Sequence, residues 1–310
     1  MKKNYIVTLR TLSPLFIGSG EKLRKSEYLY NKNNRKATII NQSKLVEELQ
    51  KKNLLDEFIK EVIEKKENLY RFLSRYQLPT TFHKYTLFLV DTEHSKPIND
   101  LSMFAKNGLG EVYVPGSSLK GALRTCMLNN FDEDHKDNDL FRHISVSDSE
   151  PIGYEHLAIY QKIDYASEKK GKSKISLYRE CIKPGTIITF NLTIDDKEVT
   201  IETIELGIKN TQEKYYEWSK GFRYGTLDKN KNIIYFGGGV GFVSKTLHYK
   251  TSPKDQVKWD VYKMLKEKYK LYGKMRTIPN NVPIAIKLAN HNGKFMEMGR
   301  CEINFKEISR

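Results

Sequence analysis

The chain has 310 residues, with 53 Lys or Arg against 38 Asp or Glu, a formal net charge of +15 and a pI near 9.4. Such a basic excess favours a polyanionic partner, either a nucleic acid or an acidic membrane surface. The sequence contains no apolar run that approaches the ~18 residues of a membrane-spanning helix, and no secretory signal core at its N-terminus. We therefore expect a cytoplasmic protein whose partner is a nucleic acid and not a membrane.

The cysteines do not indicate a metal centre. Cys126, Cys181 and Cys301 are too far apart for a zinc-ligand pattern, and they are odd in number. We expect them to be reduced, buried thiols. The sequence predicts neither a bound metal nor a cofactor.

The first 91 residues predict a strand, a glycine-containing loop, a hairpin and a helical insertion. Apolar and polar residues alternate over 4–12, which is typical of a strand. The strand leads to Gly18-Ser19-Gly20, which we expect to be a flexible loop, either an ordinary turn or a set of backbone N–H groups that face an anion. The following elements are predicted as a hairpin at 27–31 and 37–40, a helical insertion at about 42–78 and a strand at 83–91.

The stretch 112–131 predicts the end of a strand, a turn and a helix. Pro115-Gly116 is a turn signal, and Ser117 or Ser118 is the expected N-cap of a helix that runs to about Asn130. Lys120 and Arg124 lie close to the helix N-terminus, where unpaired N–H groups and a partial positive charge suit a phosphate. The alternative is an ordinary amphipathic helix with two solvated basic residues.

The remaining residues predict strands at 141–148, 157–163 and 186–195, helices at 199–218 and 254–272, and closing strands at 282–289 and 296–305. The order strand, helix, two strands, helix, strand is ferredoxin-like (RRM-like). The lysine-rich segment 167–174 is either a solubilising tip or a basic finger on RNA.

A second glycine-rich loop follows a predicted strand near residue 235. Its glycines are Gly237, Gly238, Gly239 and Gly241, and Lys245 follows them. Clustered glycines let successive backbone N–H groups approach phosphates, whereas the alternative is a tight turn beside the sheet. A dinucleotide-binding motif would need a glycine at Phe242.

Several separated motifs carry a resemblance to one family. PGSSLKGALR resembles the signature helix of the RAMP superfamily, the RRM-like subunits of CRISPR effector complexes, and GGGVGF resembles its glycine loop. Further stretches are similar to the type III-A (Csm) subunit that caps the 3′ end of the guide RNA (crRNA): LSPLFIGSGE, LAIYQKIDY, SLYRECI, YGKMRTIPNNVPIAIK and MGRCEI.

We therefore expect an α+β, ferredoxin-like (RRM-like) RAMP fold with a helical insertion. Residues 1–195 would form the RRM-like RAMP domain with its insertion at about 42–78. Residues 196–310 would form a second, less regular RRM-like lobe that contains the glycine-rich loop.

The resemblance implies a non-catalytic subunit that binds crRNA, caps its 3′ end and supports its maturation by recruited nucleases. It implies as partners the crRNA, an adjacent backbone RAMP subunit and a small helical subunit of the Csm complex, with host ribonucleases as further candidates. The residues expected to contact RNA are Gly18, Ser19, Gly20, Ser117, Ser118, Lys120, Arg124, Gly237, Gly238, Gly239, Gly241 and Lys245.

The sequence shows no catalytic set. RAMP subunits that cut target RNA carry an aspartate on the loop after their first strand, and here that region offers only Glu21 and Glu27. The alternative is a RAMP endoribonuclease acting on crRNA precursor or target RNA, motivated by the closeness of His143 to Asp148 in the sequence.

Overall fold

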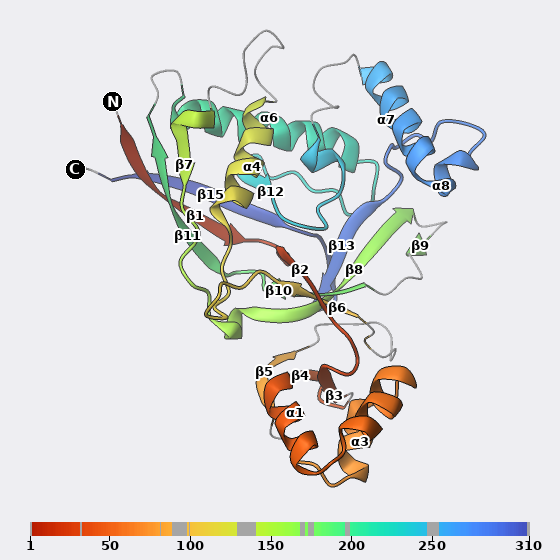
Figure 1. The fold of residues 1–310 in the computed structure, drawn as a ribbon. Helices are drawn as coiled ribbons and strands as arrows, with labels where there is room; N and C mark the ends of the chain where they lie inside the picture. The colour runs from red at the N-terminus through yellow and green to blue at the C-terminus, as the bar shows by residue number, and fades with distance from the viewer. Residues whose placement is uncertain are drawn as a thin grey trace.

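The structure is a computed structural model that describes residues 2–31, 33–80, 82–88, 98, 100–128, 141–167, 171–172, 177–195, 199–246 and 254–308. Figure 1 shows a larger body of sheets and helices, from which a smaller lobe projects. The lysine-rich segment 167–174 falls largely outside the described residues, as do the last residues of the strand expected at 83–91.

A five-stranded sheet forms one layer of the body. Its strands, in spatial order, are β12 (Ile233–Tyr235), β15 (Arg300–Glu307), β1 (Lys3–Thr11), β11 (Ile187–Ile194) and β7 (Ile144–Val146). The alternation predicted for β1 is present, because Tyr5, Val7 and Leu9 are buried while the residues between them are more exposed. β1 pairs antiparallel with β11 on one side and with the C-terminal β15 on the other. The N- and C-terminal strands are therefore neighbours. This sheet contains strands from both sides of residue 195, where the sequence predicted the boundary between two domains.

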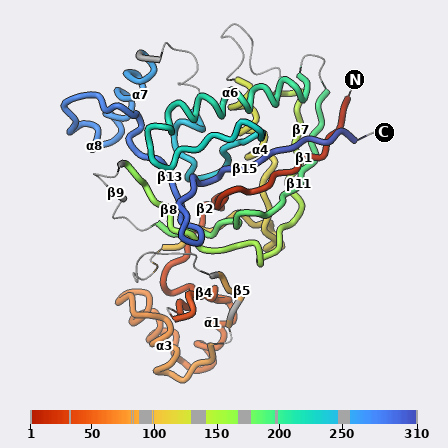
Figure 2. The backbone as a smooth tube through the Cα atoms, turned by 180° about the vertical axis from the view of Figure 1, so that it is seen from behind, coloured from red at the N-terminus to blue at the C-terminus, as the bar shows by residue number. Residues whose placement is uncertain are grey.

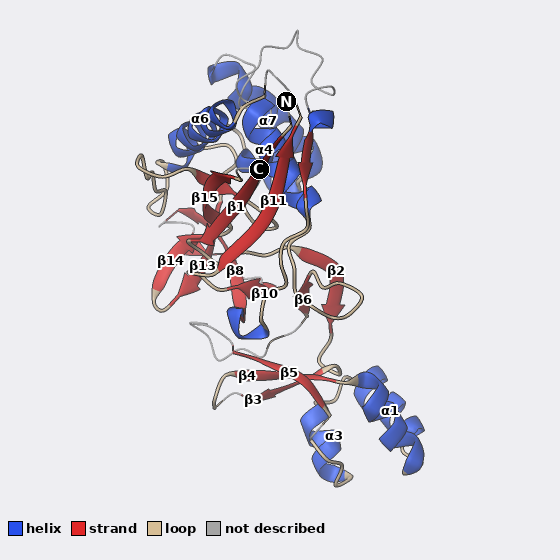
Figure 3. Ribbon diagram, turned by 90° about the vertical axis from the view of Figure 1, so that its left-hand side faces the viewer, coloured by secondary structure: helices blue, strands red, loops and turns tan. Residues whose placement is uncertain are grey.

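Two helices cover one face of this sheet, α4 (Gly116–Leu128) and α6 (Ile201–Ser219) (Figure 1 and Figure 3). Leu123 of α4 and Ile204 of α6 belong to the same buried cluster as Val7 and Leu9 of β1. α6 begins at residue 201 because Thr200 caps it: the Thr200 hydroxyl accepts a hydrogen bond from the Thr203 N–H, and the Thr203 hydroxyl accepts one from the Thr200 N–H.

A second sheet lies beside the first. Its spatial order is β14 (Lys294–Glu297), β13 (Ile286–His291), β8 (Leu157–Ser167), β10 (Leu177–Ile182), β6 (Leu101–Phe104) and β2 (Gly18–Leu23), and β9 (Gly171–Lys172) pairs with β8. Strands from the N-terminal, central and C-terminal parts of the chain thus share this sheet. The helices α7 (Lys254–Lys268) and α8 (Lys270–Gly273) lie beside β13 and β8, as Figure 1 and Figure 2 show from opposite sides.

The projecting lobe contains the predicted hairpin and helical insertion. It has three strands, β3 (Tyr28–Asn31), β4 (Lys36–Ile40) and β5 (His83–Phe88), and the helical segments α1 (Gln42–Lys51), α2 (Leu55–Phe58), a π-helical turn (Ile59–Glu64) and α3 (Leu69–Arg75). The lobe has its own apolar core, which includes Leu45, Leu49 and Phe72. The side chains of Asn41 and Asn68 cap α1 and α3.

Three local expectations were wrong. Gly18-Ser19-Gly20 is not a flexible loop but the start of β2, where Gly18 pairs with Phe104. α4 already begins at Gly116, so neither Ser117 nor Ser118 is its N-cap. The helix expected over 254–272 is interrupted at Tyr269, which separates α7 from α8.

Among the described residues, no helix is both long and apolar enough to cross a membrane.

Candidate nucleic-acid interface

The glycine loop is fastened to the segment that joins β1 to β2. The N–H of Gly238 donates a hydrogen bond of 2.6 Å to the backbone oxygen of Phe16. Gly237 has a φ of +80°, and a Cβ at this position would lie 2.4 Å from the same oxygen. Only glycine allows this backbone conformation and this close approach together. The loop is therefore held in place by the protein itself, and the Gly238 N–H is used for that purpose and not offered to a ligand.

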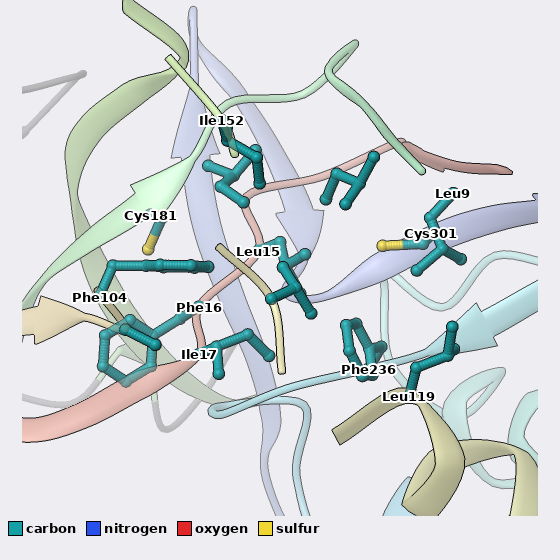
Figure 4. Close-up of a cluster of buried hydrophobic side chains, with 14 of the residues drawn as sticks. Leu9, Leu15, Phe16, Ile17, Phe104, Leu119, Ile152, Cys181, Phe236 and Cys301 are labelled. Carbon is teal, nitrogen blue, oxygen red and sulfur yellow. The ribbon is translucent and has the colours of Figure 1, made fainter. Parts of the chain in front are cut away.

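The glycine loop and α4 are supported by one apolar cluster. Leu119 of α4 and Phe236, which directly precedes the loop, are both fully buried there. Figure 4 shows these two side chains close to each other, with Leu15, Phe16 and Ile17 beside them. The cluster fixes the position of the two elements relative to each other, although more than a hundred residues separate them in the sequence.

Between these two elements lies a cleft of about 250 Å³, which we call the α4 cleft. It is lined by Ser118, Gly121, Ala122 and Thr125 from α4, and by Tyr235, Phe236, Gly237, Ser244 and Lys245 from the glycine-loop side. A Cβ at Gly121 would meet no atom within 4 Å, so the helix surface is open there. The signature helix and the glycine loop thus share one concave surface, as a common RNA-binding site requires.

The two basic residues predicted on α4 do not line this cleft. A helix turns by about 100° per residue, so Lys120 and Arg124 point away from the face formed by Ser118, Gly121 and Ala122. The Arg124 guanidinium instead lies over the Phe141 ring, 5.5 Å from its centroid.

The N-terminus of α4 already has an anionic partner within the chain. The Gly116 N–H donates a hydrogen bond of 2.8 Å to Asp148 Oδ1. A carboxylate at this position stabilises the helix end by the same interaction that a phosphate would make. The sequence did not reveal Asp148 in this role, because 32 residues separate it from Gly116.

A larger cavity of about 960 Å³ also borders the glycine loop, and we call it the cationic cavity. The lining residues come from β8, β10, the glycine loop, the α7–α8 region, and β13 with the segment before it: Lys162, Asp164, Ala166, Arg179, Gly239, Gly241, Phe242, Lys245, Leu265, Tyr269, Leu271, Tyr272, Pro283, Ile284, Ala285 and Lys287. These include four cationic side chains and one carboxylate, a net charge of +3 (4 − 1). Lys245 lines both the cationic cavity and the α4 cleft, so the two hollows meet at this residue.

Strand pairing brings the charged groups to one face of the second sheet. Lys287 of β13 is directly opposite Asp164 of β8, and its ammonium lies 3.0 Å from Asp164 Oδ1. Lys162 Nζ lies 2.7 Å from the same oxygen. The pKa of Asp164 is lowered in spite of burial, because both lysines stabilise its charged form. Ile163 and Leu288 point to the opposite face, into an apolar cluster.

Arg179 and Lys245 make no ion-pair contact with a carboxylate of the described residues, although the charge of Asp164 acts on Arg179. Within the described part of the chain neither forms an ion pair, and Arg179 Nη1 is buried without a hydrogen-bond partner. The Arg179 guanidinium lies over the Phe16 ring, 4.6 Å from its centroid. It also packs against Gly239, because a Cβ added at this glycine would lie only 2.4 Å from Arg179 Nη1. Burial lowers the pKa of Arg179, and burial together with the charge of Arg179 lowers the pKa of Lys245. Arg179 is partly buried and Lys245 is exposed, and two neighbouring cations that form no ion pair are a candidate site for an anion.

The predicted RNA-contacting residues thus divide into two groups. Ser118 and Gly237 line the α4 cleft, Gly239 and Gly241 line the cationic cavity, and Lys245 lines both. The other predicted residues line neither the α4 cleft nor the cationic cavity: Gly18, Ser19, Gly20, Ser117, Lys120, Arg124 and Gly238.

Sequence reasoning missed Lys162, Arg179 and Lys287. The available signal was the alternation of charged and apolar residues in β8, which predicts a charged face, but the register that adds β10 and β13 cannot be read from local sequence. Among the described residues no group of three or more His, Cys, Asp or Glu side chains could hold a metal ion.

Comparison with known proteins identifies the family. The model of the RAMP superfamily matches residues 8–244. A curated relative from Enterococcus italicus, described as CRISPR system Cms protein Csm5, is 34% identical over 99% of both chains. A protein of the same description from Streptococcus thermophilus is 29% identical, again over 99% of both chains. The chain belongs to the RAMP superfamily and, within it, to the family of Csm5 proteins.

Solved structures show the same fold. A chain in a cryo-EM structure of a Csm–crRNA–target RNA ternary complex of a type III-A CRISPR-Cas system has a TM-score of 0.74 and 18% identity, over 98% of this chain and 100% of that one. The crystal structure of T. onnurineus Csm5 has a TM-score of 0.63 and 17% identity, over 95% of this chain and 99% of that one. The predicted α+β RAMP fold is confirmed.

Proposed function

We propose that this chain is a subunit of a type III-A CRISPR (Csm) complex that binds crRNA, caps its 3′ end and supports its maturation by recruited nucleases without cutting RNA itself. The observation that carries the proposal is the α4 cleft, where the RAMP signature helix and the glycine loop form one concave surface, which shares Lys245 with the cationic cavity. The names of the full-length relatives, and the presence of crRNA in a complex that contains a chain of the same fold, support it.

The geometry suits an RNA backbone. At Gly121 the helix presents bare backbone to the cleft, so a ribose-phosphate chain can approach closely there. Lys245 and Arg179 supply positive charge, and neither forms an ion pair with a carboxylate of the described chain. Contacts of this kind recognise phosphates and carry little base information, so binding would depend little on sequence. In this arrangement the chain's partners are crRNA and neighbouring Csm subunits, with host ribonucleases recruited to the protruding RNA end.

A charge placed in the α4 cleft tests this function. Gly121→Glu puts a carboxylate into open space on a helix surface, where a side chain costs no packing and glycine is a poor helix former, so the chain remains folded. Gly121→Gln has nearly the same shape without the charge and is the matched control. We expect the complex assembled with the glutamate variant to lose protection of the crRNA 3′ end against a 3′ exonuclease, whereas the glutamine variant retains most of it. Equal protection by both variants would contradict the proposal.

The absence of cutting is tested with the purified chain and crRNA precursor. We expect the precursor to remain intact. Products that disappear in the His143→Ala variant would instead establish the endoribonuclease alternative, and products that persist in it would identify a contaminant.

A further inference from the structure

The cationic cavity has two walls of different chemistry. The first wall is the charged face of the second sheet together with the glycine loop, and it carries Lys162, Asp164, Arg179, Lys245 and Lys287. The second wall is apolar and partly aromatic, and its residues come from the glycine loop, the α7–α8 region and the segment before β13: Phe242, Leu265, Tyr269, Leu271, Tyr272, Pro283 and Ile284. An amphiphilic ligand with an anionic group and a flat apolar group fits such a cavity.

The charged wall is built for an anion before any ligand arrives. Asp164 offsets part of the charge of Lys162 and Lys287, through contacts of 2.7 Å and 3.0 Å. Arg179 and Lys245 remain without an ion pair among the described residues, and Phe16 holds the Arg179 guanidinium in a fixed orientation from one side. A bound phosphate would give both cations an anionic partner and would offset the desolvation of the partly buried Arg179.

The apolar wall is held in place by its own small core. Val261, Leu265 and Tyr272 are buried in a cluster against which Phe242 packs. The Tyr272 hydroxyl accepts a hydrogen bond of 2.9 Å from the Ile284 N–H, so the segment before β13 is tied to α8. Tyr269 remains about half exposed, with a relative accessibility of 49%, although it lines the cavity. Because Phe242 belongs to the glycine loop, both walls are joined at that loop.

We propose that the cationic cavity holds a single unstacked nucleotide, with its phosphate on Arg179 and Lys245 and its base against the wall formed by Phe242 and Tyr269. The α4 cleft meets the cavity at Lys245, so an RNA strand lying in the cleft can place its terminal nucleotide there. This assignment rests on the function proposed above. The same chemistry would admit a free mononucleotide, and the experiment distinguishes the two sources.

A nucleotide fits better than inorganic phosphate alone. The cavity volume of about 960 Å³ is at the upper end of the ~300–1,000 Å³ that small-molecule sites occupy, and half of its lining is apolar. Aromatic side chains stack on any base, so capture of the end would require no particular terminal sequence.

The test uses the full-length chain and short single-stranded RNAs that carry the fluorescent base 2-aminopurine at the 3′ end, at the 5′ end or inside the strand. Binding should quench the 3′-terminal probe most strongly, because that base leaves solvent and stacks on the aromatic wall. A second RNA of the same length lacks the 3′-terminal base. Because stacking on an aromatic side chain contributes ~1–3 kcal/mol per base, the abasic end should weaken binding roughly tenfold.

Two variants locate the effect. Tyr269→Ala removes an exposed ring from the cavity wall, and Tyr70→Ala, which removes a similarly exposed ring of α3, is its control. Tyr269→Ala should weaken binding of the complete RNA roughly tenfold, abolish quenching of the 3′-terminal probe and leave binding of the abasic RNA unchanged. Arg179→Gln should weaken binding of both RNAs, whereas Arg71→Gln on α3 should weaken neither.

The outcomes separate the inference from the function on which it rests. If the chain binds complete and abasic RNA equally well, and Tyr269→Ala changes neither affinity, the cavity does not hold the terminal nucleotide and only the inference is overturned. If the chain does not bind RNA at all, the proposed function fails as well. Titration with AMP tests whether the cavity holds a free nucleotide. If Tyr269→Ala weakens AMP binding, while AMP neither displaces the bound RNA nor changes the quenching of its 3′-terminal probe, the cavity is assigned to a free nucleotide and not to the RNA end.

Discussion

Replacing both Arg179 and Lys245 by glutamine should change the salt dependence of RNA binding. Binding of a single strand releases about 0.7 counterions per neutralised phosphate. Because Arg179 and Lys245 are assigned to one phosphate, removing both cations should reduce the slope of log K against log salt by about 0.7. Each charge-assisted hydrogen bond contributes ~1.5–3 kcal/mol, so the double variant should bind about 100-fold more weakly or worse. Fluorescence anisotropy of a labelled single-stranded RNA over a series of salt concentrations measures both quantities.

The control for this experiment is the double variant Arg71→Gln and Lys209→Gln. It removes the same total charge from the exposed surfaces of α3 and α6, outside both hollows. The slope should stay near the wild-type value, because distant surface charges are screened within about 10 Å at 0.1 M salt. An unchanged slope in the Arg179 and Lys245 variant, or equal changes in the two variants, would refute the assignment of these cations to phosphates.

The thermal stability of the Lys245→Gln variant distinguishes a defect in RNA binding from misfolding. Burial and the charge of Arg179 lower the pKa of Lys245 below its ordinary value of 10.5. A lysine whose pKa is lower in the folded state destabilises the fold at pH values below that folded pKa, and this cost fades as the pH rises through it towards 10.5. The unbound Lys245→Gln variant should therefore unfold at the same or a higher temperature than wild type at neutral pH, and its advantage should shrink in alkaline solution. A lowered melting temperature at neutral pH would contradict this reasoning.

Three further predictions concern single positions. Gly239→Ala forces a Cβ to 2.4 Å from Arg179 Nη1 at a φ of +85°, so it should weaken RNA binding at least as much as Arg179→Gln and also lower the melting temperature, as anisotropy and thermal unfolding can show. Burial raises the pKa of Glu297 from 4.5 to about 7 in the folded state, so stability should fall by up to ~3 kcal/mol as the pH rises from 5 to 8; urea unfolding should show this loss in wild type and not in Glu297→Gln. The thiols of Cys126, Cys181 and Cys301 are buried and should react with a thiol reagent such as DTNB only after unfolding. Rapid reaction of the native chain would contradict their burial.

The local elements were predictable because their signals are local. Alternation in β1, the turn residues of the β3–β4 hairpin and the apolar spacing of α4 and α6 each specify one element within a short window. The glycine loop was predictable for the same reason, since Gly237 and Gly239 must adopt positive φ values. Where such an element begins depends on side chains nearby in space, and this is why the start of α4 was misplaced.

The site as a whole was only partly predictable, because it depends on contacts between distant segments. Lys120 and Arg124 were chosen from their closeness to a helix N-terminus, yet Asp148 occupies that end and Phe141 lies under Arg124. Conversely, Arg179 became recognisable only when strand pairing placed it beside Asp164 and Lys245. A short sequence window contains neither the register of a sheet nor the compensation of a charge by a residue far along the chain.

In the proposed arrangement the RNA 3′ end lies across the α4 cleft and the cationic cavity. Crosslinking in the assembled Csm complex tests this placement, with a photoreactive nucleotide at the 3′ end of the crRNA and mass spectrometry of the attached peptides. We predict crosslinks to the glycine loop and its flanking residues, within 235–245, and to the cavity wall at 265–272. Crosslinks confined to the projecting lobe at 28–88, or to the uncovered face of the five-stranded sheet, would contradict it.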